Sequence, residues 1–151
     1  MLESTTIQFY QLLTTPLQVA LTGLVAKAVD GGYQICITAE VEAQNMLSNA
    51  LWEQGGTAFL PNCDVSEPTA EHHHIIFSAQ PSIANNANVL IITNMLEYDA
   101  NMPKYDKILF IFNGNVEHEL TNARGLWKKY QEQNYQLIYF KQSDNGGWQK
   151  I

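Results

Sequence analysis

Apolar positions along the chain follow two different rhythms. Short, nearly continuous apolar runs, such as 88–93 and 106–112, have the length and composition of buried strands. Between them, apolar residues recur three or four positions apart, which is typical of helices packed on one side. We therefore predict strands at 7–12, 33–38, 57–60, 74–78, 88–93, 106–112 and 135–142, and helices at 16–28, 40–52 and 116–133.

The order of these elements predicts the fold class. Strands alternate with helices, which favours an α/β fold with a mostly parallel sheet and helices on both faces. Pro16 suits the start of the first helix, and Asp30-Gly31-Gly32 is a stop signal at its end. Residues 61–72 and the tail from Ser143 are rich in turn formers and are predicted to lack strands. We find no linker that would divide residues 1–151 into two domains.

Composition supports one packed domain. The chain has 151 residues, of which 46% are hydrophobic, enough for a sizeable core. No apolar run is long enough to span a membrane, and the N-terminal stretch has Glu3 and no basic region, so we expect no secretory signal. Cys36 falls in an apolar strand and Cys63 in a loop. Two reduced thiols in a cytoplasmic protein is the favoured interpretation, and a single disulfide is the alternative.

Charge is distributed unevenly along the chain. The net charge is −7, yet residues 1–103 contain one base, Lys27, while residues 104–151 contain the other seven. An acidic first two-thirds disfavours tight, direct DNA binding. The basic remainder could attract an acidic partner, with scattered surface charge as the alternative.

The chain lacks the usual signatures of catalysis, cofactor binding and metal binding. The first strand–helix turn reads LTTP, without the glycines of a dinucleotide loop, and no phosphate-binding GxxxxGK[ST] is present. Three consecutive histidines, His72–His74, point alternately in an extended segment and so do not suit one metal ion. We predict no catalytic residues, no cofactor and no metal; a nucleotide-dependent enzyme on the same fold is the alternative function.

The helix at 116–133 carries the best candidate site. Arg124, Trp127 and Lys128 lie at i, i+3 and i+4, so they share one patch at the border of the apolar stripe of Leu120, Ala123, Trp127 and Tyr130. A guanidinium pairs with a carboxylate, and an adjacent indole can hold an apolar side chain. This combination suits an acidic peptide terminus, although basic residues bordering a core helix often only extend into water.

Several segments together resemble the chi subunit of bacterial DNA polymerase III holoenzyme. They are FYQLLTTPLQVAL, AQNMLSNALW with FLPN, ILFIFNGN, ARGLWKKYQEQNYQLIYFKQ and GGWQK, in this order over nearly the whole chain. The resemblance implies a Rossmann-like fold without nucleotide chemistry and a non-catalytic adaptor. It also implies two partners: the psi subunit, which leads to the clamp loader, and the acidic C-terminal tail of single-stranded DNA-binding protein, so that DNA is reached only indirectly.

The resemblance also implies site residues. Arg124 matches an arginine that binds the terminal carboxylate of the tail, Trp127 and Lys128 match residues of the same pocket, and Trp52 and Phe59 match aromatics near that surface. Leu120 stands where a well-known member of the family has a lysine one turn before the arginine. The patch therefore has one positive charge fewer, which Lys129 is placed to replace.

Overall fold

Continuous apolar runs form the centre of the sheet. In the computed structural model, which describes residues 5–53 and 60–151, every residue of β2 (Ile35–Thr38), β4 (Ile75–Ser78) and β5 (Val89–Ile92) is buried. Strands of this kind are covered on both faces. The other elements are β1 (Thr6–Leu12), α1 (Leu17–Asp30), α2 (Val41–Glu53), β3 (Cys63–Asp64), the 3-10 helix Ala70–His72, β6 (Lys107–Asn113), α3 (Glu117–Glu132), β7 (Gln136–Gln142) and β8 (Trp148–Lys150).

The strands of the described residues form one mostly parallel sheet, as predicted. Its eight strands have the order β3-β4-β2-β5-β6-β1-β7-β8. All neighbouring pairs are parallel except β7 and β8, which are antiparallel. The long strands β1, β6 and β7 therefore lie side by side in one half of the sheet, with the short β8 at their edge, and the short strands β2, β3, β4 and β5 form the other half.

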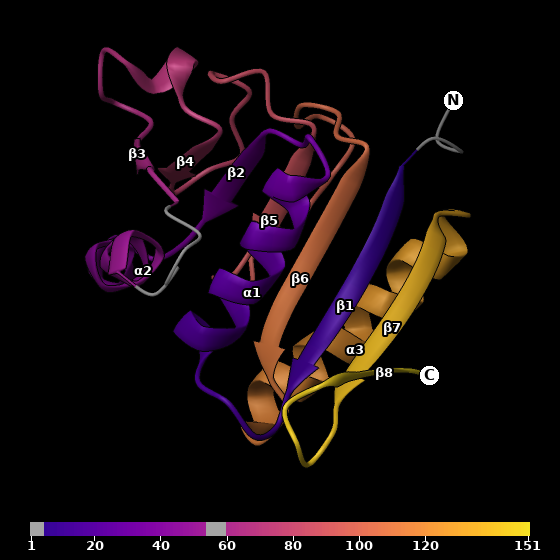
Figure 1. Cartoon of the computed structure of the whole chain (residues 1–151). Helices are drawn as coiled ribbons and strands as arrows, with labels where there is room; N and C mark the ends of the chain where they lie inside the picture. Colours follow the sequence, from indigo (N-terminus) through magenta and orange to yellow (C-terminus); the bar gives the residue numbers. More distant parts are fainter. Residues whose placement is uncertain (1–4, 54–59) are drawn as a thin grey trace.

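Helices cover both faces of the sheet, also as predicted (Figure 1). We call the face that packs against α1 and α2 the first face, and the face that packs against α3 the second face. Side chains alternate along β1, so Phe9 belongs to the second-face core and Tyr10 to the first-face core. At the end of α1, Gly32 has a φ of 86°, the left-handed conformation that the predicted stop signal requires.

The structure corrects two predictions on turn-rich segments. Residues 148–150 form β8 instead of a turn-like tail, because the turn at Ser143–Gly147 closes a hairpin in which the Ser143 N–H donates to the Gly147 carbonyl at 2.8 Å. Cys63 and Asp64 form β3 beside β4, although two residues are too few to give a strand pattern. The strand predicted at 57–60 falls mainly outside the described residues, and Leu60 itself is not in a strand.

None of the helices in the described part of the chain combines the length and the apolar character that a membrane span needs.

Candidate functional site

The helix α3 is fixed on the second face by a buried stripe. Ala123, Leu126 and Tyr130 are buried, and Leu120 and Trp127 are partly buried against the same core. At the start of the helix, the Asn113 N–H donates to the Glu119 carboxylate at 3.1 Å, which ties the preceding turn to the first helical residues. The predicted stripe is thus confirmed, with Leu126 added to it.

Trp127 is held by aromatic neighbours from two strands. Its ring makes edge contacts with Phe9 of β1 at 5.5 Å and with Tyr139 of β7 at 5.6 Å between centroids. Edge-to-face arrangements of this kind are favourable beyond simple burial. Because the indole is only partly buried, part of it stays accessible beside α3.

Arg124 and Lys128 extend from the border of this stripe into solvent. Both side chains are exposed, and neither takes part in the two ion pairs found among the described residues. The guanidinium lies close enough to Tyr139 to affect it: burial raises the pKa of the Tyr139 phenol, and the charge of Arg124 opposes that increase. The structure therefore brings together Arg124, Trp127 and Lys128, as predicted, and adds Tyr139.

The contribution of β7 was missed in the sequence. The Tyr139 hydroxyl donates to the Gln11 side-chain oxygen, which fixes the phenol between β1 and α3. Lys141 follows two positions later, so strand alternation puts it on the same face as Tyr139. That alternation was the available signal, but only the tertiary fold shows that β7 lies beneath Arg124.

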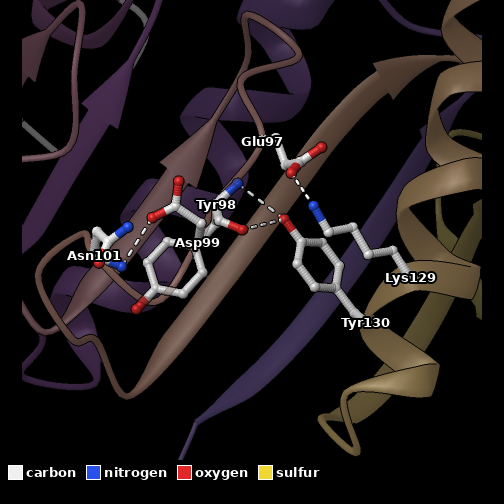
Figure 2. A network of polar contacts seen from close by, with 6 residues as sticks. All are labelled: Glu97, Tyr98, Asp99, Asn101, Lys129 and Tyr130. Atoms are coloured by element: carbon white, nitrogen blue, oxygen red, sulfur yellow. Dashed lines mark hydrogen bonds and ion pairs between the residues drawn. The ribbon is translucent and has the colours of Figure 1, made fainter.

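Lys129 does not replace the charge that is absent at Leu120. Its ammonium pairs with the carboxylate of Glu97 in the loop before β6 (Figure 2). Figure 2 also shows the neighbouring Tyr98 and Tyr130: the Tyr98 N–H donates to the Tyr130 hydroxyl at 2.8 Å, and this hydroxyl donates to the Tyr98 carbonyl at 2.7 Å. This side of α3 therefore binds the chain's own loop.

The two other predicted site residues, Trp52 and Phe59, stay predictions. Trp52 is 42% exposed at the end of α2, which packs on the first face with α1, whereas Arg124 and Trp127 lie on α3 on the second face. Phe59 lies outside the described residues. The patch that the structure defines, which we call the α3 patch, consists of Arg124, Trp127, Lys128 and Tyr139.

The loop where a doubly wound fold binds phosphate is occupied by a side chain of the protein itself. The backbone N–H groups of Leu13, Thr14 and Thr15 all donate to the side-chain oxygen of Gln142, at 3.0, 2.9 and 3.1 Å. Three amides converging on one oxygen is the arrangement that a phosphate would otherwise use. The Gln142 side-chain amide also donates to the Thr15 hydroxyl at 2.7 Å, so the loop is closed from both sides.

Histidines and cysteines form no metal centre in the part of the chain that the structure describes. His74 bonds to the Gln34 side chain, and His72 lies 3.6 Å from the Glu71 carboxylate, so neighbouring histidines turn to different partners. Both cysteines are free thiols. Burial raises the pKa of Cys36 to about 11, so this thiol is protonated at neutral pH and is a poor nucleophile.

The described residues thus define an α/β protein with an exposed cationic and aromatic patch on one helix and a self-occupied first loop. The sequence model of the family described as DNA polymerase III chi subunit, HolC, matches residues 4–138, and the chain belongs to this family. A search of curated proteins gave no match. Family membership gives the chain a role in DNA replication as a DNA polymerase III subunit.

Proposed function

We propose that this chain is a non-catalytic adaptor of the DNA polymerase III holoenzyme. In this proposal it links the clamp loader, through the psi subunit, to the acidic C-terminal tail of single-stranded DNA-binding protein. The carrying observation is the exposed Arg124 beside Trp127 and Tyr139, without an ion pair among the described residues. An arginine that has no ion pair within its own chain can bind a carboxylate group of a partner protein.

The α3 patch has a suitable group for each part of the tail: its terminal carboxylate, its last side chain and the acidic residues before it. The guanidinium of Arg124 would pair with the terminal carboxylate, and the accessible part of Trp127 would pack against the terminal phenylalanine. Lys128, and Lys141 on the neighbouring strand, would attract the acidic residues that precede it. Electrostatic attraction of this kind speeds association and weakens as salt screens it.

Non-catalytic action is favoured over a nucleotide-dependent enzyme by the first loop. In the proposed Rossmann-like sheet, the three backbone N–H groups that would bind a phosphate donate to the Gln142 side-chain oxygen instead. A nucleotide would have to displace this side chain and leave its amide without partners, which is costly for a group that is 4% exposed.

Calorimetry with a synthetic tail peptide tests the proposal. Arg124→Ala should lose a charge-assisted contact worth about 1.5–3 kcal/mol, which is roughly a 10-fold to 100-fold weaker Kd. Lys104→Ala is the matched control, because it removes one exposed charge that does not belong to the α3 patch and should change the Kd little. The melting temperature of both variants should stay near that of the natural chain, since neither side chain is buried.

Two results would count against the proposal. An unchanged Kd for Arg124→Ala would remove the α3 patch from tail binding. A thermal shift with ATP or NAD, and none with the tail peptide, would favour the enzyme. Trp52 stays a predicted contact of the tail, and Trp52→Ala in the same titration measures its contribution.

A further inference from the structure

The first face of the sheet carries a groove that is separate from the α3 patch. It has a volume of about 700 Å³ and lies between α1 and the strands β1, β7 and β8. Figure 1 shows α1 in front of β5 and β6, whereas β1 and β7 beside it have no described helix in front of them. On the second face α3 packs against β6 and β7. The strand β7 is therefore covered by α3 on the second face, whereas on the first face no described helix covers β1 or β7.

Aromatic rings form the floor at one end of the groove. The Tyr10 ring stacks on Phe140 at 4.8 Å and meets Trp148 edge-on at 5.0 Å between centroids. All three residues line the groove, and Phe140 and Trp148 are only partly buried. Pockets for small groups are commonly of this size and mostly apolar, with a few polar groups that set the orientation.

The wall of the groove is widened by a missing side chain. Val19, Gly23 and Lys27 follow one another at intervals of four along α1 and all line the groove. A Cβ added at Gly23 would have no other atom within 4 Å, so the space beside this turn is empty. Val19, one turn earlier, is 45% exposed.

Two ammonium groups line the same groove. Lys107 lies with its Nζ 4.6 Å above the ring of Tyr33, and Lys27 is exposed in the last turn of α1. Neither lysine belongs to an ion pair among the described residues. Asp30 and Asp106, their neighbours in sequence, are exposed as well and lower the local positive potential without pairing within salt-bridge distance.

We propose that this groove is a second binding site for an acidic peptide terminus with an apolar last residue. The terminal aromatic side chain would lie on the floor of Tyr10, Phe140 and Trp148, and the peptide carboxylates would approach Lys27 and Lys107. The inference rests on the proposed adaptor function, because it assigns the same class of ligand to a second surface. Since the groove and the α3 patch lie on opposite faces, one chain would hold two such termini at once and gain avidity where both belong to one partner assembly.

Tryptophan provides a separate reporter for each surface. The chain has three tryptophans: Trp127 in the α3 patch, Trp148 in the groove and Trp52 on α2. In ¹⁵N-labelled full-length protein, each indole N–H gives its own NMR signal, assigned by single Trp→Phe variants. Titration with the acidic, phenylalanine-ended tail peptide should shift the Trp127 and Trp148 signals, each with its own Kd.

Variants separate the two sites. Lys27→Ala and Lys107→Ala should each weaken the Kd read at Trp148 by about five-fold, a typical size for a partly exposed charge contact. Gly23→Leu, which fills the groove, should abolish the Trp148 shift, whereas Gly125→Leu on the exposed side of α3, also with open space around it, should leave that shift unchanged. Arg124→Ala should weaken only the Kd read at Trp127. Amidation of the peptide terminus should weaken the Kd read at Trp127, where Arg124 would bind the terminal carboxylate.

The outcomes distinguish the inference from the proposed function. A Trp127 shift without a Trp148 shift would overturn the groove proposal and leave the adaptor function standing. A Trp148 shift that disappears in Arg124→Ala, or that Lys27→Ala and Gly23→Leu leave unchanged, would also overturn it. If neither signal shifts, the α3 patch fails as well, and with it the tail-binding part of the proposed function.

Discussion

One small residue controls the position of Tyr139 in the α3 patch. A Cβ on Gly114, in the turn after β6, would lie 2.5 Å from both the Cγ and the Nε2 of Gln11. Gln11 accepts the hydrogen bond from the Tyr139 hydroxyl, so a displaced Gln11 would release the phenol. A larger residue at this position would require the Gln11 side chain to shift, which the turn signal NGN alone does not say.

Replacing this glycine should therefore be costly. Gly114→Ala is expected to lower the free energy of unfolding by about 1–3 kcal/mol, as for an overpacked interior site. The matched control is Gly23→Ala, where the added methyl meets open space and should raise stability by roughly 0.5–1 kcal/mol through helix propensity. Urea denaturation measures both, and equal effects of the two changes would refute this account of Gly114.

At this scale the sequence predicted only the residues that lie on one element. Arg124, Trp127 and Lys128 follow from helical spacing, because i, i+3 and i+4 meet on any helix. Tyr139 and Gln11 lie on two other strands, and their meeting with Arg124 depends on the order of β1 and β7 in the sheet. No local pattern contains that information.

Among the elements, α3 is fixed by the loop at 93–105 as well as by the sheet. The Tyr130 hydroxyl both accepts a hydrogen bond from the Tyr98 N–H and donates one to the Tyr98 carbonyl, and both residues are buried. One side chain thereby satisfies two backbone groups of a loop (Figure 2). The exposed pair Glu97–Lys129 beside it is expected to contribute less than 1 kcal/mol.

Removing the Tyr130 hydroxyl should loosen this loop. Tyr130→Phe leaves two buried backbone groups without partners, so the free energy of unfolding should fall by about 1–3 kcal/mol, and the Tyr98 amide should exchange its hydrogen faster. Tyr135→Phe is the control, because Tyr135 is less buried and contacts Tyr130 through its ring. Unchanged amide exchange at Tyr98 in Tyr130→Phe would show that the loop is held by other contacts.

Apolar runs of five or more residues predicted strands well, whereas strands of only two or three residues were missed. The runs at 88–93 and 106–112 and the long amphipathic helix at 116–133 appear within one or two residues as β5, β6 and α3. The edge strands β3 and β8 were missed, because each has two or three residues and draws its stability from a neighbouring strand. Edge strands of this length form only by pairing with a neighbouring strand, and a turn-rich sequence contains no local pattern that predicts this pairing.

For the molecule as a whole, the sequence indicated a covered parallel sheet but not how completely it is covered. The three α-helices of the described residues are few for a sheet of this width, so an open region is expected, yet its place follows only from the strand order. The first strand, β1, lies between β6 and β7, in the middle of the long strands. The helix α1 does not reach β7, so the first face of β7 is uncovered by any described helix. The groove of the further inference is a consequence of that order.

Buried tyrosines should make the whole fold sensitive to alkaline pH. Burial raises the pKa of Tyr10 to about 12, and burial likewise raises the pKa values of Tyr105 and Tyr130. Each phenol therefore keeps its proton in the folded state at a pH where the unfolded chain, with a pKa near 10, has lost it. The unfolded state then binds fewer protons, so the free energy of unfolding should fall as the pH rises above about 10, by up to roughly 1.4 kcal/mol per pH unit for each such group. The buried Cys36 thiol should begin a similar decrease at a slightly lower pH. Urea titrations at pH 8, 9, 10 and 11 measure this slope.

Tyr10→Phe should make the slope shallower by about one proton. The variant also loses the 2.7 Å hydrogen bond from the Tyr10 hydroxyl to Gln8 and so starts from a lower stability. A free energy of unfolding that stays level between pH 9 and pH 11 would contradict the burial of these phenols.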